Sequence, residues 1–169
     1  MSPANPLPVL ASDPALARDT EELYDALEDL LRVYQFRDRD RICCFDVSVS
    51  QCYALEGLVR RGSMTLNELA AHLYLDKSTA SRVVDALERK AYAARLPHPR
   101  DRRASLLEAT PAGRELEGKI RESILAEERE LLADFTPEVR QAMTQVLRRL
   151  ARAAAASVET GGGSCCRIP

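Results

Sequence analysis

The sequence predicts a mostly α protein of the α+β class, with long helices toward both ends and one small β-hairpin between them. Charged residues make up 30% of the 169 residues and aromatic residues only 5%, with no Trp. Long stretches are rich in Ala, Leu, Glu and Arg, and their apolar residues recur three, four or seven positions apart, as one buried helix face requires. Because 169 residues lie inside the usual range for one domain, we expect one compact unit.

The first element is a long helix over about residues 14–39. It follows an arm at residues 1–12, which contains three prolines and is expected to be flexible. The apolar residues of the helix repeat at helical spacing and are expected to form one buried face. They are Leu16, Leu23, Leu27, Leu30, Leu31 and Tyr34. Residues 41–46 break this pattern, so we predict a connector there.

Capping boxes mark the start of the next two helices. Ser48 is followed three residues later by Gln51, and Thr65 is followed by Glu68. In this arrangement a hydroxyl and a Glu or Gln side chain bind backbone N–H groups that have no partner inside the helix. The two helices are therefore predicted over about residues 48–61, where Gly62 ends the first, and 65–73.

A turn at residues 74–76 leads to a third short helix, over about residues 77–90. Its apolar side is formed by Ala80, Val83, Val84 and Leu87. Two short helices joined by a three-residue turn are typical of a helix-turn-helix. Residues 93–96 and 104–109 are short enough to be strands, and the Pro- and Arg-rich residues 97–103 between them form a natural hairpin tip. This hairpin predicts a wing, so residues 48–110 are predicted to form a winged helix-turn-helix lobe.

Two Thr-Pro pairs mark the start of the last two helices. Thr110 with Pro111, and Thr136 with Pro137, each supply an N-cap and a first-turn proline. The helices are predicted over about residues 111–133 and 137–158. Residues 159–169 are expected to form a flexible tail rich in Gly and Cys.

Positive charge is concentrated in the middle of the chain, although the formal net charge of the whole is −2. Residues 77–103 carry eight basic and three acidic groups, a net charge of +5. Residues 1–76 carry seven basic and thirteen acidic groups, a net charge of −6. Such a basic block in an acidic protein directs a polyanion to one face.

The basic block has the residue types that a DNA-reading surface needs. Small hydroxyl residues near the start of the 77–90 helix let the backbone approach phosphate, and an Arg one turn later reaches a base edge. Arginines on a projecting hairpin suit the minor groove, and an acidic residue among them can hold one of them in place. The alternatives are a solvated amphipathic helix and a surface charge run. The predicted DNA-binding residues are Lys77, Ser78, Thr79, Ser81, Arg82, Arg100, Asp101, Arg102 and Arg103.

At these residues the chain resembles the MarR family of bacterial transcriptional regulators. The resemblance covers about residues 15–155 and rests on the segments LNELAAHL at 66–73, DKSTASRVVDALE at 76–88, DRR at 101–103 and ATPAG at 109–113. It implies a homodimer held together by helices 14–39 and 111–158, within a single domain over residues 13–158. It also implies a pseudo-palindromic double-stranded DNA operator, repression more often than activation, and effectors that act between the dimerisation helices and the lobe.

The five cysteines predict an effector site. They lie in two short segments, with Cys43, Cys44 and Cys52 at the junction of the first two helices and Cys165 and Cys166 in the tail. A helix N-terminus lowers the pKa of a nearby thiol, and clustered thiolates favour thiophilic ions. We therefore expect a trivalent arsenic or antimony effector, arsenite or antimonite, at Cys43, Cys44 and Cys52. This layout is also similar to that of MarR relatives associated with arsenic.

Several alternatives remain open for the cysteines. An oxidant or electrophile could modify them, Cys52 could be a small buried apolar residue, and adjacent cysteines also occur by chance. Zinc is less favoured, because a four-ligand site needs a second close pair or a nearby His. The tail cysteines could fold back onto the first cluster or stay apart from it.

An enzyme is not expected, because the sequence has no Gly-rich phosphate loop, no HExxH motif and no nucleophile with an evident base and acid partner. No cofactor is expected to be required. A helical interaction module that does not bind DNA is a further alternative, although it would leave the hairpin arginines without a role. We expect no membrane association and a cytoplasmic location, because no apolar run approaches the length of a membrane span and no secretory signal layout is present. Reduced thiols are normal in that compartment.

Overall fold

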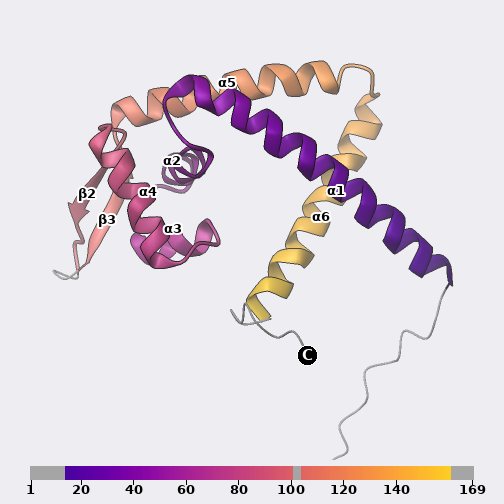
Figure 1. Ribbon diagram of the computed structural model, residues 1–169, viewed down its shortest axis with the longest axis horizontal. Coiled ribbons are helices and arrows are strands. Elements are labelled where there is room, and N and C mark those ends of the chain that lie inside the picture. Colours follow the sequence, from indigo (N-terminus) through magenta and orange to yellow (C-terminus); the bar gives the residue numbers. More distant parts are fainter. Residues whose placement is uncertain (1–13, 101–103, 161–169) are drawn as a thin grey trace, which may run out of the picture. The chain divides into compact units, whose positions relative to one another are not determined.

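A computed structural model describes residues 14–100 and 104–160 (Figure 1). It is mostly helical with one small antiparallel sheet, which confirms the predicted fold class. In chain order the elements are α1 (Pro14–Ile42), the 3-10 helix η1 (Cys43–Phe45), α2 (Val49–Arg61), β1 (Met64–Thr65), α3 (Leu66–His72), α4 (Lys77–Arg89), β2 (Ala93–Pro97), β3 (Ser105–Ala109), α5 (Pro111–Leu131) and α6 (Pro137–Thr160).

Contacts within the chain divide it into two compact units, Met1–Arg121 and Glu122–Pro169. From the chain length, one compact unit is expected. The boundary falls inside α5. The first turns of that helix bury Gly113, Glu117 and Ile120 against the first unit. The rest of α5 is grouped with α6. The predicted single domain over residues 13–158 stays a prediction.

The first unit has a small apolar core built around the sheet. The strand order is β1-β3-β2, and both pairs of strands are antiparallel. Leu107 in the central strand is fully buried, and it is paired with Met64 of β1 and with Arg95 of β2. Helices α2, α3 and α4 complete the core with fully buried apolar side chains. These are Leu55, Leu58, Leu69, Val84 and Leu87.

The capping boxes predicted from the sequence are present. At the start of α2, the Gln51 N–H donates to Ser48 Oγ and the Ser48 N–H donates to Gln51 Oε1, both over 3.3 Å. At the start of α3, the Glu68 N–H donates to Thr65 Oγ1 over 3.3 Å, and the Thr65 N–H donates to the Glu68 carboxylate over 2.7 Å. Both helices therefore begin where local sequence places them.

The connector between α1 and α2 is shorter than predicted. Helix α1 continues to Ile42, beyond the expected end at Arg39, because the side chain of Ile42 is buried in the core with only 1% of its surface exposed. Residues 43–45 then form η1 instead of an irregular loop. Asp46 ends this element in the left-handed region, at φ 55°. The helical pattern therefore continues through most of the segment that was predicted to break it.

The predicted buried face of α1 is largely exposed in the single chain, and so is an apolar stripe along α6. Leu16, Leu23, Leu30 and Leu31 of α1 keep 42–57% of their surface accessible. The corresponding residues of α6 are also exposed; they are Val139, Met143, Val146 and Leu147. The other two residues of the predicted α1 face, Leu27 and Tyr34, are half-buried. Exposed apolar stripes of this kind are typical of interaction surfaces.

Within the described residues, no helix is both long enough and apolar enough to cross a membrane.

Candidate nucleic-acid interface

A tight turn connects α3 to α4. The Leu73 N–H donates to the Leu69 carbonyl over 3.0 Å, and the Leu75 N–H donates to the Ala70 carbonyl over 2.9 Å. Tyr74 between them has φ 52°, in the left-handed region that closes many helices. Four residues, 73–76, therefore separate α3 from α4, one more than the three-residue turn predicted from the sequence.

Asp76 fixes the start of α4. Its carboxylate accepts hydrogen bonds from the Thr79 N–H over 2.9 Å, from Ser78 Oγ over 2.6 Å and from Thr79 Oγ1 over 2.6 Å. These bonds, first that from the Ser78 hydroxyl, hold the pKa of Asp76 far below its ordinary value. Ser78 and Thr79 were predicted to approach DNA. In this arrangement their hydroxyl hydrogens and the Thr79 N–H are used in the cap and are not available to phosphate.

The outer face of α4 carries the predicted cations. Lys77, Arg82 and Arg89 are exposed. Ala80, Val84 and Leu87 on the opposite face are fully buried, so the helix is fixed with its basic side outward. Ser81 is half-buried between the two faces. The structure therefore supports α4 as the element that presents charge, with Lys77 and Arg82 as its accessible donors.

Arg95 of β2 connects the hairpin to α4. Its guanidinium donates to Asp85 over 2.6 Å and to Glu88 over 2.8 Å. The hydrogen bond that Arg95 donates to Glu88 is the main cause that raises the pKa of Arg95 above its ordinary value. This fork neutralises two acids on α4 and limits the motion of the hairpin relative to it. The role of Arg95 is not evident from the sequence, because its partners lie on a different element, seven and ten residues earlier in the chain.

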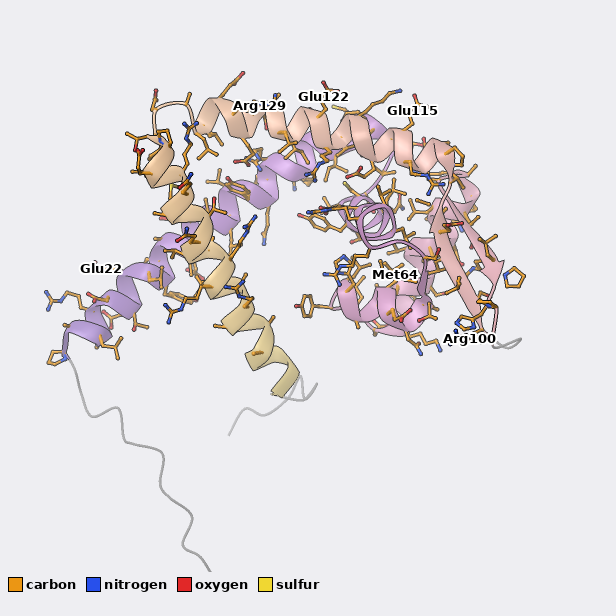
Figure 2. All side chains as sticks on the ribbon, turned by 180° about the vertical axis from the view of Figure 1, so that it is seen from behind. Glu22, Met64, Arg100, Glu115, Glu122 and Arg129 are labelled. Atoms are coloured by element: carbon orange, nitrogen blue, oxygen red, sulfur yellow. The ribbon has the colours of Figure 1, made fainter. Side chains whose placement is uncertain are left out.

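Arg100 lies at the free end of the hairpin and is exposed (Figure 2). Its backbone N–H donates to Nδ1 of His98 over 3.2 Å, and the His98 N–H donates to the Ala104 carbonyl over 3.2 Å. These bonds fold the two arms of the hairpin toward its tip. The predicted contacts of Asp101, Arg102 and Arg103 lie outside the described residues.

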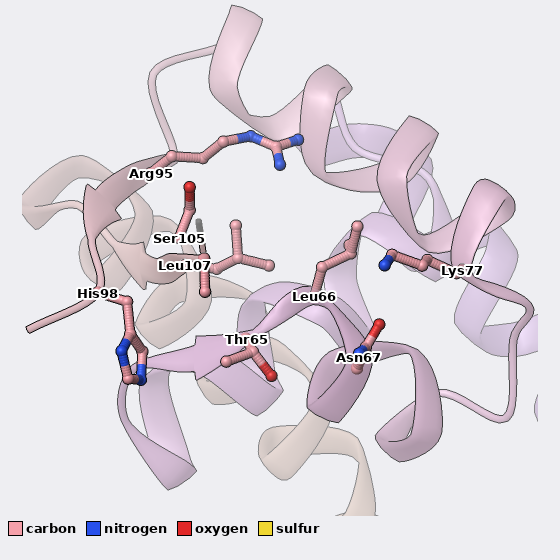
Figure 3. Close-up of a pocket in the computed structure, with 9 residues that line it drawn as sticks. Thr65, Leu66, Asn67, Lys77, Arg95, His98, Ser105 and Leu107 are labelled. Atoms are coloured by element: carbon pink, nitrogen blue, oxygen red, sulfur yellow. The ribbon is translucent and has the colours of Figure 1, made fainter. Parts of the chain in front are cut away.

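A hollow of about 470 Å³ lies between α3, the start of α4 and the hairpin (Figure 3). Polar side chains from all three elements surround it, among them Asn67, Lys77 and His98. Arg95 lies at its edge, held toward α4 by its ion pairs. Because Lys77 is a cation and Asn67 has an amide donor, the hollow has the chemistry of an anion-binding surface, although Arg95 at its edge is already paired with two carboxylates.

The structure places two of the five cysteines in full. Cys44 lies in η1 and its side chain is exposed, whereas Cys52 lies in the first turn of α2 and is buried, with 7% of its surface accessible. The Cys52 N–H donates to the Ser48 carbonyl over 2.8 Å. Cys43 lies in η1, but its side chain and the whole of Cys165 and Cys166 are outside the described residues. Within the described part of the chain, no three His, Cys, Asp or Glu side chains are grouped to hold a metal ion. The three-thiolate site stays a prediction.

Comparison with known proteins identifies the family. The sequence profile of the MarR family matches residues 45–104, which span α2 to the hairpin. A helix-turn-helix-type transcriptional regulator of Mycobacterium bovis is 34% identical over 108 residues, which cover 64% of this chain and 71% of that protein. This chain belongs to the MarR family.

A further relative and two solved structures agree with this assignment. A helix-turn-helix-type regulator of Bacillus subtilis is 23% identical over 114 residues, covering 68% of this chain and 75% of that protein. The crystal structure of a MarR family transcription regulator, SP03579, aligns with a TM-score of 0.73 at 25% identity, over 86% of this chain and 98% of that one. A MarR family protein from Bacillus stearothermophilus aligns with a TM-score of 0.74 at 25% identity, over 82% and 96%. The chain is thus a MarR-type transcriptional regulator with a winged helix fold.

Proposed function

We propose that this MarR-type regulator is a homodimeric repressor that binds a pseudo-palindromic operator in double-stranded DNA. The observation that carries the proposal is the exposed basic face formed by Lys77 and Arg82 of α4 and Arg100 of the hairpin. A helix of this size fits the major groove, and a projecting arginine-bearing hairpin fits the adjacent minor groove. Two such lobes in a dimer would read half-sites about one helical turn apart, roughly 34 Å.

The apolar stripes on α1 and α6 support the homodimer. Each stripe is a row of large aliphatic side chains, such as Leu31 with 57% and Val146 with 64% of its surface exposed. Burying a side chain of this kind stabilises an interface by about 1.5–3 kcal/mol. A second copy of the chain offers the same stripes, and such self-complementary contact is the usual basis of a two-fold dimer.

The effector we propose is a thiophilic metalloid, arsenite or antimonite, bound by Cys43, Cys44 and Cys52. Cys43 and Cys44 belong to the short element η1, and Cys52 lies in the first turn of α2, eight residues beyond Cys44. Since Cys52 is buried, binding would require the connector to open, and that displacement would change the lobe.

Oxidation or alkylation of Cys44 is the second candidate. Its exposed side chain is accessible to an oxidant or electrophile without any opening of the core. A reaction at Cys44 would add volume or charge at η1, next to the buried Ile42. The two candidates differ in their need for Cys52.

Binding of the purified chain to the DNA upstream of its own coding sequence tests the DNA-binding proposal. Arg82→Ala should weaken binding by about 1–3 kcal/mol if Arg82 reads a base edge, and loss of a phosphate contact should reduce the salt slope by about 1. Lys119→Ala, which removes an exposed cation from α5, is the control and should change neither quantity. An unchanged affinity and salt slope in Arg82→Ala would contradict the role of α4.

The same assay with arsenite separates the effector candidates. Arsenite should weaken the binding of the wild-type protein to DNA at least about tenfold, which corresponds to a coupling free energy of about 1.4 kcal/mol. Cys52→Ser should abolish this response if three thiolates bind the metalloid. The oxidant candidate replaces the metalloid candidate under two conditions. Cys52→Ser must respond to arsenite as the wild type does, and Cys44→Ser must lose the response to hydrogen peroxide. Equal responses in all three proteins would exclude both cysteine mechanisms.

A further inference from the structure

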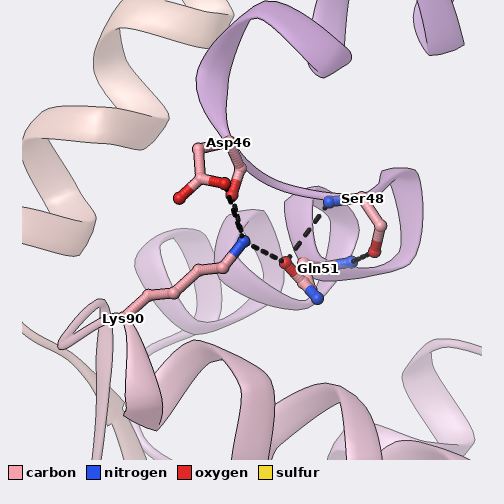
Figure 4. Close-up of polar contacts among 4 residues, drawn as sticks. All are labelled: Asp46, Ser48, Gln51 and Lys90. Atoms are coloured by element: carbon pink, nitrogen blue, oxygen red, sulfur yellow. Dashed lines mark hydrogen bonds and ion pairs between the residues drawn. The ribbon is translucent and has the colours of Figure 1, made fainter.

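The end of the recognition helix α4 is connected to the cysteine-bearing connector through one side chain. Lys90 is the C-cap residue of α4. After it the chain turns away, with Ala91 at φ 58° and the Tyr92 N–H donating to the Leu87 carbonyl over 2.9 Å. The side chain of Lys90 leaves the helix and is 30% exposed, so it packs along protein instead of extending into solvent (Figure 4).

The Lys90 ammonium contacts both sides of the connector. It donates to the backbone carbonyl of Asp46, lies 3.3 Å from Asp46 Oδ1 and lies 3.5 Å from Gln51 Oε1. An ammonium has three donors, and three acceptors surround this one. Asp46 directly follows η1, which carries Cys43 and Cys44, and Gln51 directly precedes Cys52. Lys90 thus touches the residues next to both cysteine-bearing segments.

Gln51 extends this network into the start of α2. Its Oε1 atom accepts hydrogen bonds from the Lys90 ammonium and from the Ser48 N–H. The backbone N–H of Gln51 donates to Ser48 Oγ. Asp46 holds a left-handed backbone conformation, at φ 55°, which Asp tolerates better than most residues. A small rotation at either residue would therefore move an acceptor away from Lys90.

We propose that Lys90 is a positioning residue that transmits the state of the η1–α2 connector to the recognition helix. The inference rests on the proposed function, because the connector is the element on which the proposed effector acts. An effector that displaces Asp46 or Gln51 removes acceptors from the Lys90 ammonium and releases the C-terminal end of α4. By linkage, DNA that holds α4 in place must stabilise the connector to the same degree.

A purely structural role is the competing explanation. A cation at the C-terminus of a helix stabilises it through the helix dipole whatever its other contacts. Such a role would affect the stability of α4, but DNA binding would then not change the stability of the connector. Hydrogen exchange at residues 43–52, with and without DNA, therefore distinguishes the two explanations.

The probe is the duplex that the wild-type chain selects most tightly from a random pool. In the wild type, DNA should slow exchange at residues 43–52 by at least about threefold, as reciprocal coupling requires. Lys90→Met should remove this protection, and Lys90→Arg should restore it. Lys119→Met is the matched control, because it breaks the exposed Lys119–Glu115 ion pair of 2.8 Å on α5, and it should behave as the wild type. Equal protection in Lys90→Met and the wild type would overturn the inference.

Two further measurements keep the test decisive. Because Asp46 and Gln51 hold the Lys90 ammonium, the salt slope of Lys90→Met should equal that of the wild type even where affinity falls. If Lys90→Met does not fold, Lys90→Gln is used instead, because its neutral, shorter side chain cannot reach the Asp46 carbonyl. Protection that persists in Lys90→Gln overturns the proposal in the same way.

An arsenite arm separates failure of this inference from failure of the proposed function. Wild-type affinity should fall at least about tenfold with arsenite, and that of Lys90→Met less than about twofold. Equal responses in both proteins would refute Lys90 as the coupling residue and leave the effector proposal intact. If arsenite has no effect on the wild type, the effector proposal fails, and hydrogen exchange alone decides the role of Lys90.

Discussion

Replacement of Gly113 by Ala should destabilise the first unit, because α5 begins in direct contact with backbone. A Cβ atom at this position would lie 2.1 Å from the Tyr92 carbonyl oxygen and 3.0 Å from Leu55 Cδ1. The same carbonyl accepts the Thr110 N–H over 3.0 Å, and Thr110 Oγ1 accepts the Gly113 N–H over 3.0 Å. The close approach is therefore fixed from both sides.

The size of the effect follows from this geometry. Ordinary contact begins near 3.4 Å, so the start of α5 would have to move away from Tyr92 by about 1 Å. Overpacking of this kind costs about 1–3 kcal/mol, and the obstacle here is backbone, which cannot rotate away as a side chain does. We expect about 2–3 kcal/mol, which lowers Tm by roughly 4–12 °C for a chain of this length.

Gly118→Ala in the same helix is the matched control. No atom lies within 4 Å of a Cβ added there, so the substitution should only reduce backbone entropy in the unfolded chain. It should stabilise the protein by about 0.5–1 kcal/mol. Urea unfolding followed by circular dichroism, at one protomer concentration, measures both variants. Shifts of the same sign in Gly113→Ala and Gly118→Ala would refute the close-packing argument.

Three other predictions test the dimer, a half-buried histidine and the helix cap. Val146→Glu places a charge on the apolar stripe of α6 and should convert the dimer to a monomer, as measured by light scattering. Gln141→Glu is the control and should remain a dimer. If both variants are dimeric, α6 is not part of the interface. Burial, and secondarily Arg61, lowers the pKa of His72 below its ordinary 6.5. His72 therefore binds protons less readily in the folded state, so stability should be full above about pH 6.5 and fall as pH decreases further. His72→Gln should flatten this dependence, and an equally steep loss in that variant would show that other groups cause it. Asp76→Ala should weaken DNA binding by loosening the start of α4, whereas Asp76→Ser, which still caps, should retain most of it; equal losses in both would point to a role for the carboxylate charge itself.

Local sequence was sufficient for most of the fold. The capping residues Ser48 and Thr65 act on N–H groups three residues away, and the left-handed Tyr74 closes α3 within one turn. Such signals need no information from the rest of the chain. The exception is the end of α1, where burial of Ile42 extends a helix that local pattern would stop.

The candidate interface was only partly predictable. The exposed cations Lys77, Arg82 and Arg100 follow from a basic block on an amphipathic helix and a hairpin. The Asp76 cap, which uses the hydroxyls of Ser78 and Thr79, and the hollow between three elements do not. The sequence shows which groups carry charge, but their hydrogen-bond partners depend on how the elements pack.

Taken alone, the sequence determined the order of the helices, the hairpin and the place of the basic surface, because each depends on periodicity, caps and composition within about ten residues. Only the tertiary structure brought Arg95 to Asp85 and Glu88, paired the two residues of β1 with β3, and carried Lys90 to Asp46, 44 residues earlier. It also showed that large apolar side chains along α1 and α6 are exposed. Periodicity identifies an apolar face, but the surface that covers it is set by the packing of distant segments or of a second molecule.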